Sequence, residues 1–228
     1  MSRYSISAYS LFPYFTKVNA STADEKRIQG LLYALKNGEK VNIGSGKVLT
    51  ATAWLAEMIK DAANTFPDFV GPGHHLIPVP SSSVTPTPAS ASAWPMYDVA
   101  VRLQAEGLAA TAQPAIMRAT EVASSHGGGK PSVREHEASF VVDAALLSPT
   151  EPVTLLDDVL TTGTTAMGCV LALRKVGFTG EVRLLTATHT VGSDYNAGPS
   201  ASARSEVVWF DDREWRRAWR PPKDVVFC

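Results

Sequence analysis

The sequence predicts an α/β protein built on a parallel β-sheet. Residues 153–188 read as a strand, a loop, a helix and a second strand. This order defines a βαβ unit, whose strands lie parallel in one sheet and are joined by a right-handed crossover. The apolar run from Leu76 to Val79 has the composition of a buried strand. Because ligands of such sheets bind beyond the carboxyl ends of the strands, the loop after Leu156 is the first place to look for function.

The other elements follow from apolar spacing and from residues that begin or end helices. Three segments have helical spacing between suitable cap and stop residues; they are residues 22–37, 51–66 and 96–110. Short strands are expected at residues 115–117 and 140–142. Within the βαβ unit the strands are expected at residues 153–156 and 182–188, with the helix over 163–176. Two stretches rich in Pro, Ser, Ala or Gly read as loops, residues 80–95 and 120–136.

Composition removes several classes of function. The chain has 228 residues, 45% of them hydrophobic, which fits one α/β domain with additions. A formal net charge of -1 gives no general electrostatic reason to expect nucleic acid or an anionic membrane as partner. No run approaches the roughly 18 apolar residues of a membrane span, and residues 1–15 do not read as a signal peptide. Two cysteines, Cys169 and Cys228, cannot form a disulfide framework, so a cytoplasmic location is expected.

The loop after Leu156 carries the strongest chemical signal. Two adjacent carboxylates, Asp157 and Asp158, precede a turn with one glycine, Gly163, and then a helix. Backbone N–H groups at a helix start lack intrahelical partners, and the helix dipole favours an anion there. Hydroxyl groups can add hydrogen bonds from Thr161, Thr162, Thr164 and Thr165. The pattern predicts a phosphate site beside a sugar diol, since carboxylates accept hydrogen bonds from vicinal hydroxyls and help to hold Mg²⁺. The alternative is an acidic turn with ordinary threonine caps.

This segment resembles the signature with which type I phosphoribosyltransferases bind 5-phosphoribosyl-1-diphosphate (PRPP). The resemblance implies that Asp157 and Asp158 face the ribose hydroxyls and serve catalysis, and that Thr161 to Thr165, with Gly163, hold the 5-phosphate. It implies Mg²⁺ as cofactor, carried by PRPP near the two aspartates rather than held by direct protein ligands. The implied reaction is transfer of 5-phosphoribose from PRPP to a nitrogenous base, with release of diphosphate.

A second segment is similar to the ComF-like branch of this family. Residues 76–83 (LIPVPSSS) resemble the first strand and diphosphate loop of that branch, which implies PRPP contacts from Ser81 and Ser82 and from the neighbouring Ser83. That branch continues with Arg-Gly-Phe-Asn-Gln, whereas this chain has Trp94 to Asp98 (WPMYD). The alternative for the segment is a proline-rich linker.

Residues 118–140 look like the catalytic loop of the family, which closes over PRPP and supplies cations to the departing diphosphate. The main candidates are Lys130 and Arg134, and the weaker ones are Arg118 and His126. The alternative is a glycine-rich surface loop with incidental charge. Salvage enzymes for 6-oxopurines carry an aspartate where Thr161 stands, which argues against hypoxanthine or guanine as acceptor.

The resemblance also suggests how the chain is divided. Residues 1–70 are expected to form an N-terminal helical segment that contributes a hood over the acceptor, residues 71–190 the phosphoribosyltransferase-like core, and residues 191–228 a tail. The tail combines aromatic residues with arginines, so it either packs on the core or contacts another copy of the chain or a protein partner. Two other functions stay open: a regulatory module that senses PRPP or a nucleotide without turnover, and an accessory protein in DNA uptake or defence.

Overall fold

A mostly parallel β-sheet forms the centre of the protein. The computed structural model describes residues 3–15, 23–43, 46–85, 94–122, 131–191, 202–210 and 213–218. The main sheet has seven strands in the order β11-β10-β1-β9-β8-β4-β5. In chain order these strands are β1 (Arg3–Phe15), β4 (His75–Pro78), β5 (Thr111–Ala112), β8 (Val153–Leu160), β9 (Val182–Val191), β10 (Ala203–Phe210) and β11 (Arg213–Ala218). The strands from β1 to β5 in this order pair in parallel, whereas β10 and β11 are antiparallel to their neighbours.

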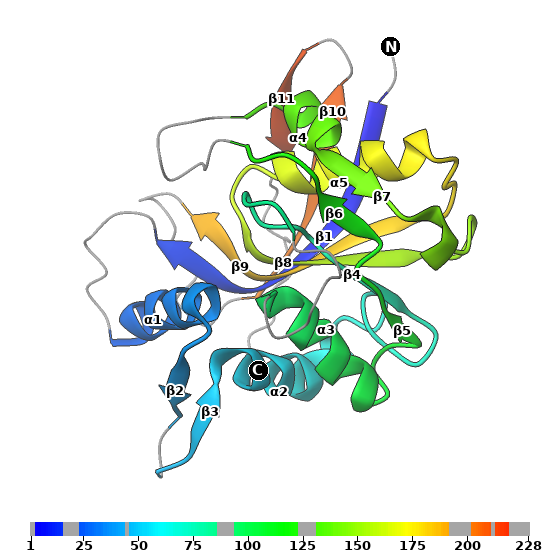
Figure 1. The fold of residues 1–228 in the computed structure, drawn as a ribbon. Coiled ribbons are helices and arrows are strands. Elements are labelled where there is room, and N and C mark those ends of the chain that lie inside the picture. Colours follow the sequence, from blue (N-terminus) through cyan, green and yellow to red (C-terminus); the bar gives the residue numbers. More distant parts are fainter. Residues whose placement is uncertain are drawn as a thin grey trace.

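Helices cover both faces of the sheet (Figure 1). One face carries α1 (Ala23–Asn37), α2 (Ala51–Ala62) and α3 (Pro95–Ala105), and the other carries α4 (Val133–Ser139) and α5 (Thr164–Lys175). Two small antiparallel pairs lie outside the main sheet; they are β2 (Lys40–Asn42) with β3 (Val48–Thr50), and β6 (Ile116–Arg118) with β7 (Phe140–Val142). Short 3-10 helices occur at η1 (Ala63–Thr65) and η4 (Ala144–Leu146).

The sheet separates two hydrophobic cores because successive strand side chains point to opposite faces. In β8, Leu155 packs in the core under α4 and α5, while Leu156 packs in the core under α1, α2 and α3. Leu184 and Leu185 of β9 divide in the same way. A strand buried on both faces is expected to be apolar at every position, as residues 153–156 are in all but one.

The predicted α/β class with a parallel sheet is therefore confirmed. The four predicted helices form, as α1, α2, α3 and α5, and the predicted strands form as β4, β6, β7, β8 and β9. Most of these helices end earlier than predicted; α2, for example, ends at Ala62 and passes into η1. Within the described residues no helix is both long and apolar enough to cross a bilayer.

Several strands and one helix were not among the predicted elements. The N-terminal segment, expected to be helical, begins with β1, which lies between β9 and β10 inside the sheet. The tail contributes β10 and β11 to the same sheet; residues 192–201, 211–212 and 219–228 lie outside the described part. Helix α4 occupies the end of the predicted loop 120–136, and its start is fixed by a capping box between Ser132 and Glu135.

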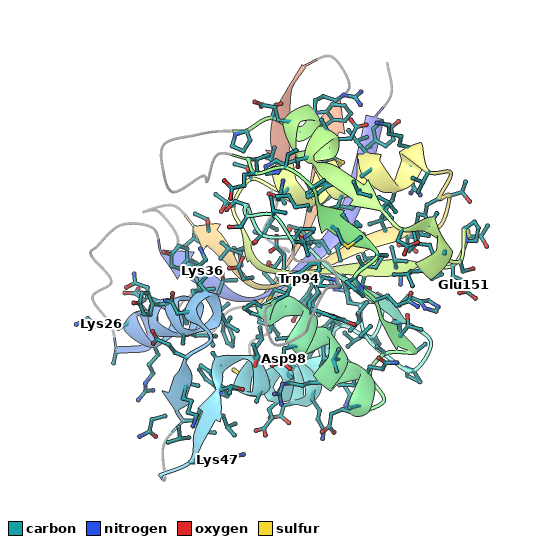
Figure 2. All side chains as sticks on the ribbon, in the orientation of Figure 1. Lys26, Lys36, Lys47, Trp94, Asp98 and Glu151 are labelled. Carbon is teal, nitrogen blue, oxygen red and sulfur yellow. The ribbon has the colours of Figure 1, made fainter. Side chains whose placement is uncertain are left out.

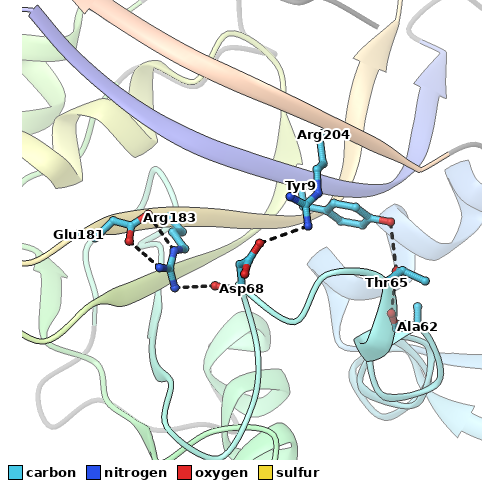
Figure 3. A network of polar contacts seen from close by, with 7 residues as sticks. All are labelled: Tyr9, Ala62, Thr65, Asp68, Glu181, Arg183 and Arg204. Carbon is cyan, nitrogen blue, oxygen red and sulfur yellow. Dashed lines mark hydrogen bonds and ion pairs between the residues drawn. The ribbon is translucent and has the colours of Figure 1, made fainter. Parts of the chain in front are cut away.

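A polar network ties the end of α2 to the sheet (Figure 3). The Tyr9 hydroxyl lies 3.3 Å from Thr65 Oγ1, and Arg183 donates to the backbone oxygen of Asp68 at 2.6 Å. The Asp68 carboxylate lies 3.4 Å from the Arg204 guanidinium. These contacts join β1, β9 and β10 to the segment after α2, so the N-terminal residues and the β10 strand are structural parts of one unit.

Candidate functional site

The connection from β8 to α5 forms the centre of the candidate site. Strand β8 has β4 on one side and β9 on the other, and it ends at Leu160. After the short turn 161–163, helix α5 begins at Thr164 with Gly163 as its N-cap. Gly163 has φ 81° and ψ 6°, a left-handed backbone that favours glycine. The free N–H groups of the first turn of α5 therefore open at the carboxyl edge of the sheet, where an anion can approach.

The acid pair lies at the end of a strand, whereas the sequence analysis placed it in the loop. Asp157 and Val159 pair with Thr186 and Thr188 of β9, so β8 continues four residues beyond its predicted end. The cause is β9, which also runs past its predicted end to Val191 and supplies hydrogen-bonding partners that outweigh the low strand preference of aspartate.

The charge of Asp158 acts on the neighbouring carboxyl group of Asp157. Burial raises the pKa of Asp157 well above its ordinary value, and the neighbouring charge of Asp158 raises it further. The same Asp157 carboxylate accepts a hydrogen bond from the backbone N–H of Asp158 at 2.9 Å. Two adjacent carboxyl groups, one of them with a raised pKa, favour a cation or a hydroxyl donor between them. The donor set therefore fits Mg²⁺ brought by a phosphorylated ligand, or a sugar diol.

Threonine hydroxyls surround the turn, as the sequence predicted. Thr162 and Thr164 lie 2.6 Å apart through their Oγ1 atoms, and Thr190 of β9 donates to Thr161 at 3.4 Å. Thr161 and Thr162 are exposed, whereas Thr164 and Thr165 are half-buried. These hydroxyls lie around the start of α5. One hydrogen of the Thr162–Thr164 pair is used in the bond between them, and the hydrogen of the other hydroxyl can be donated to an anion bound there.

The Ser81–Ser83 segment follows the neighbouring strand. Strand β4 pairs in parallel with β8, and the N–H of Val79 donates to Leu156 at 2.9 Å just beyond the last β4 residue. Ser81 and Ser83 are exposed and Ser82 is half-buried. Because the carboxyl ends of adjacent parallel strands lie at one edge, this segment and the β8–α5 turn are neighbours, as a ligand with two phosphate groups requires.

The two cations predicted for the catalytic loop have different outcomes. Lys130 and His126 lie outside the described residues. Arg134 lies on α4 rather than in a loop, where it forms a 2.7 Å ion pair with Glu137 and its guanidinium carbon lies 5.0 Å from the Trp209 ring centre. Neither contact belongs to the acid pair or to the threonine turn, so Arg134 must change partners to reach a ligand there.

Arg118 is a buried residue rather than a loop cation. It ends β6 and is 1% exposed, with its side chain between the Ser81 segment and α4. His136 of α4 lies beside it and 3.4 Å from Thr165 Oγ1. His136 was not predicted from the sequence, because it lies 29 residues before Thr165 and no local pattern marks it.

Lys36 is a second residue that the sequence analysis did not select. It lies in the last turn of α1, and Figure 2 labels it on the side of that helix toward the main sheet. Its charge acts on Asp157, lowering the pKa that burial and Asp158 raise. A basic residue of the α1 segment therefore lies within electrostatic range of the acid pair.

Comparison with known proteins adds no family assignment: no protein-family model matches the chain and no curated protein matches it. Among the described residues, no group of three or more His, Cys, Asp or Glu side chains has the arrangement of a metal site.

Proposed function

We propose that this protein has the type I phosphoribosyltransferase fold and transfers 5-phosphoribose from PRPP to a nitrogenous base. The observation that carries the proposal is the β8–α5 connection, where two adjacent aspartates precede a left-handed glycine and the N-terminus of a helix. A ribose 5-phosphate presents the complementary groups in the same order, a diol and then a phosphate. The parallel β4 strand, with the Ser81 segment at its end, supports a second anion position for the diphosphate.

The chemistry assigned to each group follows from its charge. During transfer the bond between ribose C1′ and the diphosphate oxygen breaks, a bond forms between C1′ and the acceptor nitrogen, and that nitrogen releases its proton. Asp157 and Asp158 orient the ribose through its hydroxyls, and the threonine turn with the α5 amides holds the 5-phosphate. Mg²⁺, when bound with PRPP, offsets the negative charge of the diphosphate. Lys130 and Arg134 remain the proposed cations of the leaving group.

Turnover is tested by measuring diphosphate release with PRPP, Mg²⁺ and a panel of purine, pyrimidine and pyridine bases. Release that depends on one base would support the transferase. Tight PRPP binding without release on any base would replace it with a PRPP-sensing module, and absence of PRPP binding would refute both.

Asp158→Asn is expected to weaken PRPP binding about 10–100-fold, because a hydrogen bond to a charged group contributes about 1.5–3 kcal/mol. Asp61→Asn on the exposed side of α2 removes the same charge far from the edge and serves as the matched control. Equal PRPP affinity of the two variants in calorimetry would exclude Asp158 from the site.

Gly163→Ala is expected to abolish binding of ribose 5-phosphate. The matched control is Gly177→Ala at the other end of α5, since Gly177 has φ 87° and a Cβ there would meet open space. Both substitutions force a left-handed alanine, which costs about 1–2 kcal/mol of stability. Only Gly163 lies at the phosphate turn, so the loss of binding should be confined to it; equal binding by both folded variants would disprove the phosphate position.

A further inference from the structure

Arg118 is a buried cation surrounded by neutral groups. Its Nε donates to the backbone oxygen of Ser81 and its Nη1 to the hydroxyl of Ser139. Its Nη2 lies 3.4 Å from Nδ1 of His136, and its guanidinium carbon lies 4.4 Å from the centre of the Phe140 ring. Burial lowers the pKa of Arg118, while Cys169 and Asp157 act in the opposite direction. A cation is costly to bury, so an arginine placed there with hydrogen bonds to neutral partners requires an explanation.

The hydrogen bond to Ser81 fixes the direction of the next peptide N–H. In a trans peptide the C=O of one residue and the N–H of the next point in opposite directions. The C=O of Ser81 points inward to Arg118, so the N–H of Ser82 points away from it. Arg118 therefore sets the orientation of the amide that the diphosphate would meet.

The contact with His136 determines the tautomer of that histidine. Burial first, and then the charge of Arg118, lowers the pKa of His136 to about 4, so its imidazole is neutral near pH 7. Arginine only donates hydrogen bonds, so Nδ1 of His136 must be the acceptor and the ring proton must lie on Nε2. Nε2 lies 3.4 Å from Thr165 Oγ1, so His136 donates to that oxygen and the hydroxyl hydrogen of Thr165 is directed elsewhere.

From these contacts we propose that Arg118, through His136, is the positioning residue that holds the two anion-binding segments of the site in register. It orients the Ser82 amide on one side, and on the other it makes the Thr165 hydroxyl a donor toward the 5-phosphate. The proposal rests on the proposed function, because it assigns the two segments to the two phosphate ends of one PRPP molecule. Arg118 itself is buried and does not touch the ligand.

Arg118→Lys separates positioning from charge. Lysine keeps the positive charge but lacks the planar fork that reaches Ser81 and Ser139 together. The variant is expected to bind Mg²⁺-diphosphate about 10-fold more weakly than the wild type. Arg174→Lys is the matched control, since Arg174 also donates to backbone oxygens, those of Phe178 and Gly180, at the far end of α5. Arg174→Lys should lower the stability of the protein without changing its affinity for Mg²⁺-diphosphate or for ribose 5-phosphate.

Two variants of His136 test its hydrogen bond to Thr165 while Arg118 stays in place. In His136→Gln the side-chain amide nitrogen can occupy the place of Nε2 and donate to Thr165, whereas the shorter side chain of His136→Asn cannot. Ribose 5-phosphate affinity should therefore be retained in His136→Gln and reduced about 10-fold in His136→Asn. A long-range ¹H–¹⁵N spectrum of the wild-type protein should show His136 protonated on Nε2, and the tautomer should change or mix in Arg118→Lys.

The experiment uses calorimetry of the full chain with Mg²⁺-diphosphate and ribose 5-phosphate as separate probes, after circular dichroism has established that each variant is folded. If the wild type binds both probes and the folded Arg118 and His136 variants bind them with the same affinities, the positioning role is overturned but the proposed function is not. Protonation of wild-type His136 on Nδ1 would also overturn the positioning role. Wild-type binding of neither probe would overturn the proposed function and this role together.

Discussion

Gly168→Ala is expected to destabilise the protein even though alanine is the better helix former. Gly168 lies in α5, and a Cβ there would come within 2.5 Å of Cβ of His136, 3.2 Å of N of Glu137 and 3.3 Å of O of Val133. Two of these three atoms belong to the α4 backbone and cannot rotate away, so α4 would have to shift as a unit. Overpacking of this kind costs about 1–3 kcal/mol, against a gain of about 1 kcal/mol from helix propensity.

Gly30→Ala is the matched control for that substitution. Gly30 lies on the exposed side of α1, and a Cβ there would meet nothing within 4 Å. This variant is expected to gain about 0.5–1 kcal/mol of stability. Because both substitutions share the propensity gain, the difference between them measures the contact of α5 with α4, about 1–3 kcal/mol.

Urea denaturation and thermal unfolding measure this difference directly. A domain of this size loses about 2–4 °C in Tm for each kcal/mol. Gly168→Ala should also weaken ribose 5-phosphate binding, because a displaced α4 carries His136 away from Thr165. Stabilities that are equal, or higher for Gly168→Ala than for Gly30→Ala, would refute the close packing of α4 on α5.

Three other substitutions, one of them with a matched control, test particular contacts. Ser132→Ala should lower the free energy of unfolding by about 0.5–2 kcal/mol in urea titrations, since it removes the N-cap of α4; no change would mean that the cap is not formed. Leu155→Ala should cost about 2–5 kcal/mol at a fully buried position, whereas Val141→Ala on the exposed side of β7 should change stability by less than about 0.5 kcal/mol. Asp157→Asn should become stabilising as pH rises. Burial raises the pKa of Asp157, so the stability associated with its proton is full below the ordinary carboxyl pKa of about 4 and is lost as pH rises through the raised value. A difference in unfolding free energy between Asp157→Asn and the wild type that stays constant from pH 4 to pH 8 would contradict this.

The sequence predicted the elements whose local and tertiary preferences agree. Residues 153–156 are apolar and buried on both faces, and α5 combines a glycine start with basic residues in its last turn. Both patterns are local, so they could be identified from the sequence without knowledge of the tertiary structure. The β1 strand was missed although apolar Tyr4, Ile6 and Ala8 alternate with Ser5 and Ser7. Its pairing partners, β9 and β10, lie far along the chain.

Of the candidate site, only the part that is contiguous in sequence could be selected from the sequence, and its role stays a prediction. The acid pair and the threonine turn form one run of sequence, whereas Arg118, His136 and Lys36 approach it only because β6, α4 and α1 fold around it. The capping box of Ser132 and Glu135 was visible in the sequence and would have shortened the predicted loop 120–136 to expose α4. No local pattern would have identified Arg118 as buried, since arginine is rarely buried without an ionic partner.

The charges beneath the carboxyl edge favour binding over stability. A carboxyl group whose pKa is raised by burial destabilises the folded state at neutral pH. The Arg118 guanidinium loses solvation, and its hydrogen-bond partners among the described residues are neutral. Apolar residues of similar size at both positions would give a more stable fold. Asp157 and Arg118 lie on two sides of one edge, where the free amides of α5 and the Ser81 segment also open. A destabilising carboxyl group such as Asp157 is expected where a ligand supplies the missing interaction, whereas the buried Arg118 acts only through the segments that it contacts. A diol with Mg²⁺ would complete the acid pair, and two phosphate groups would complete the amides that Arg118 and His136 hold in place.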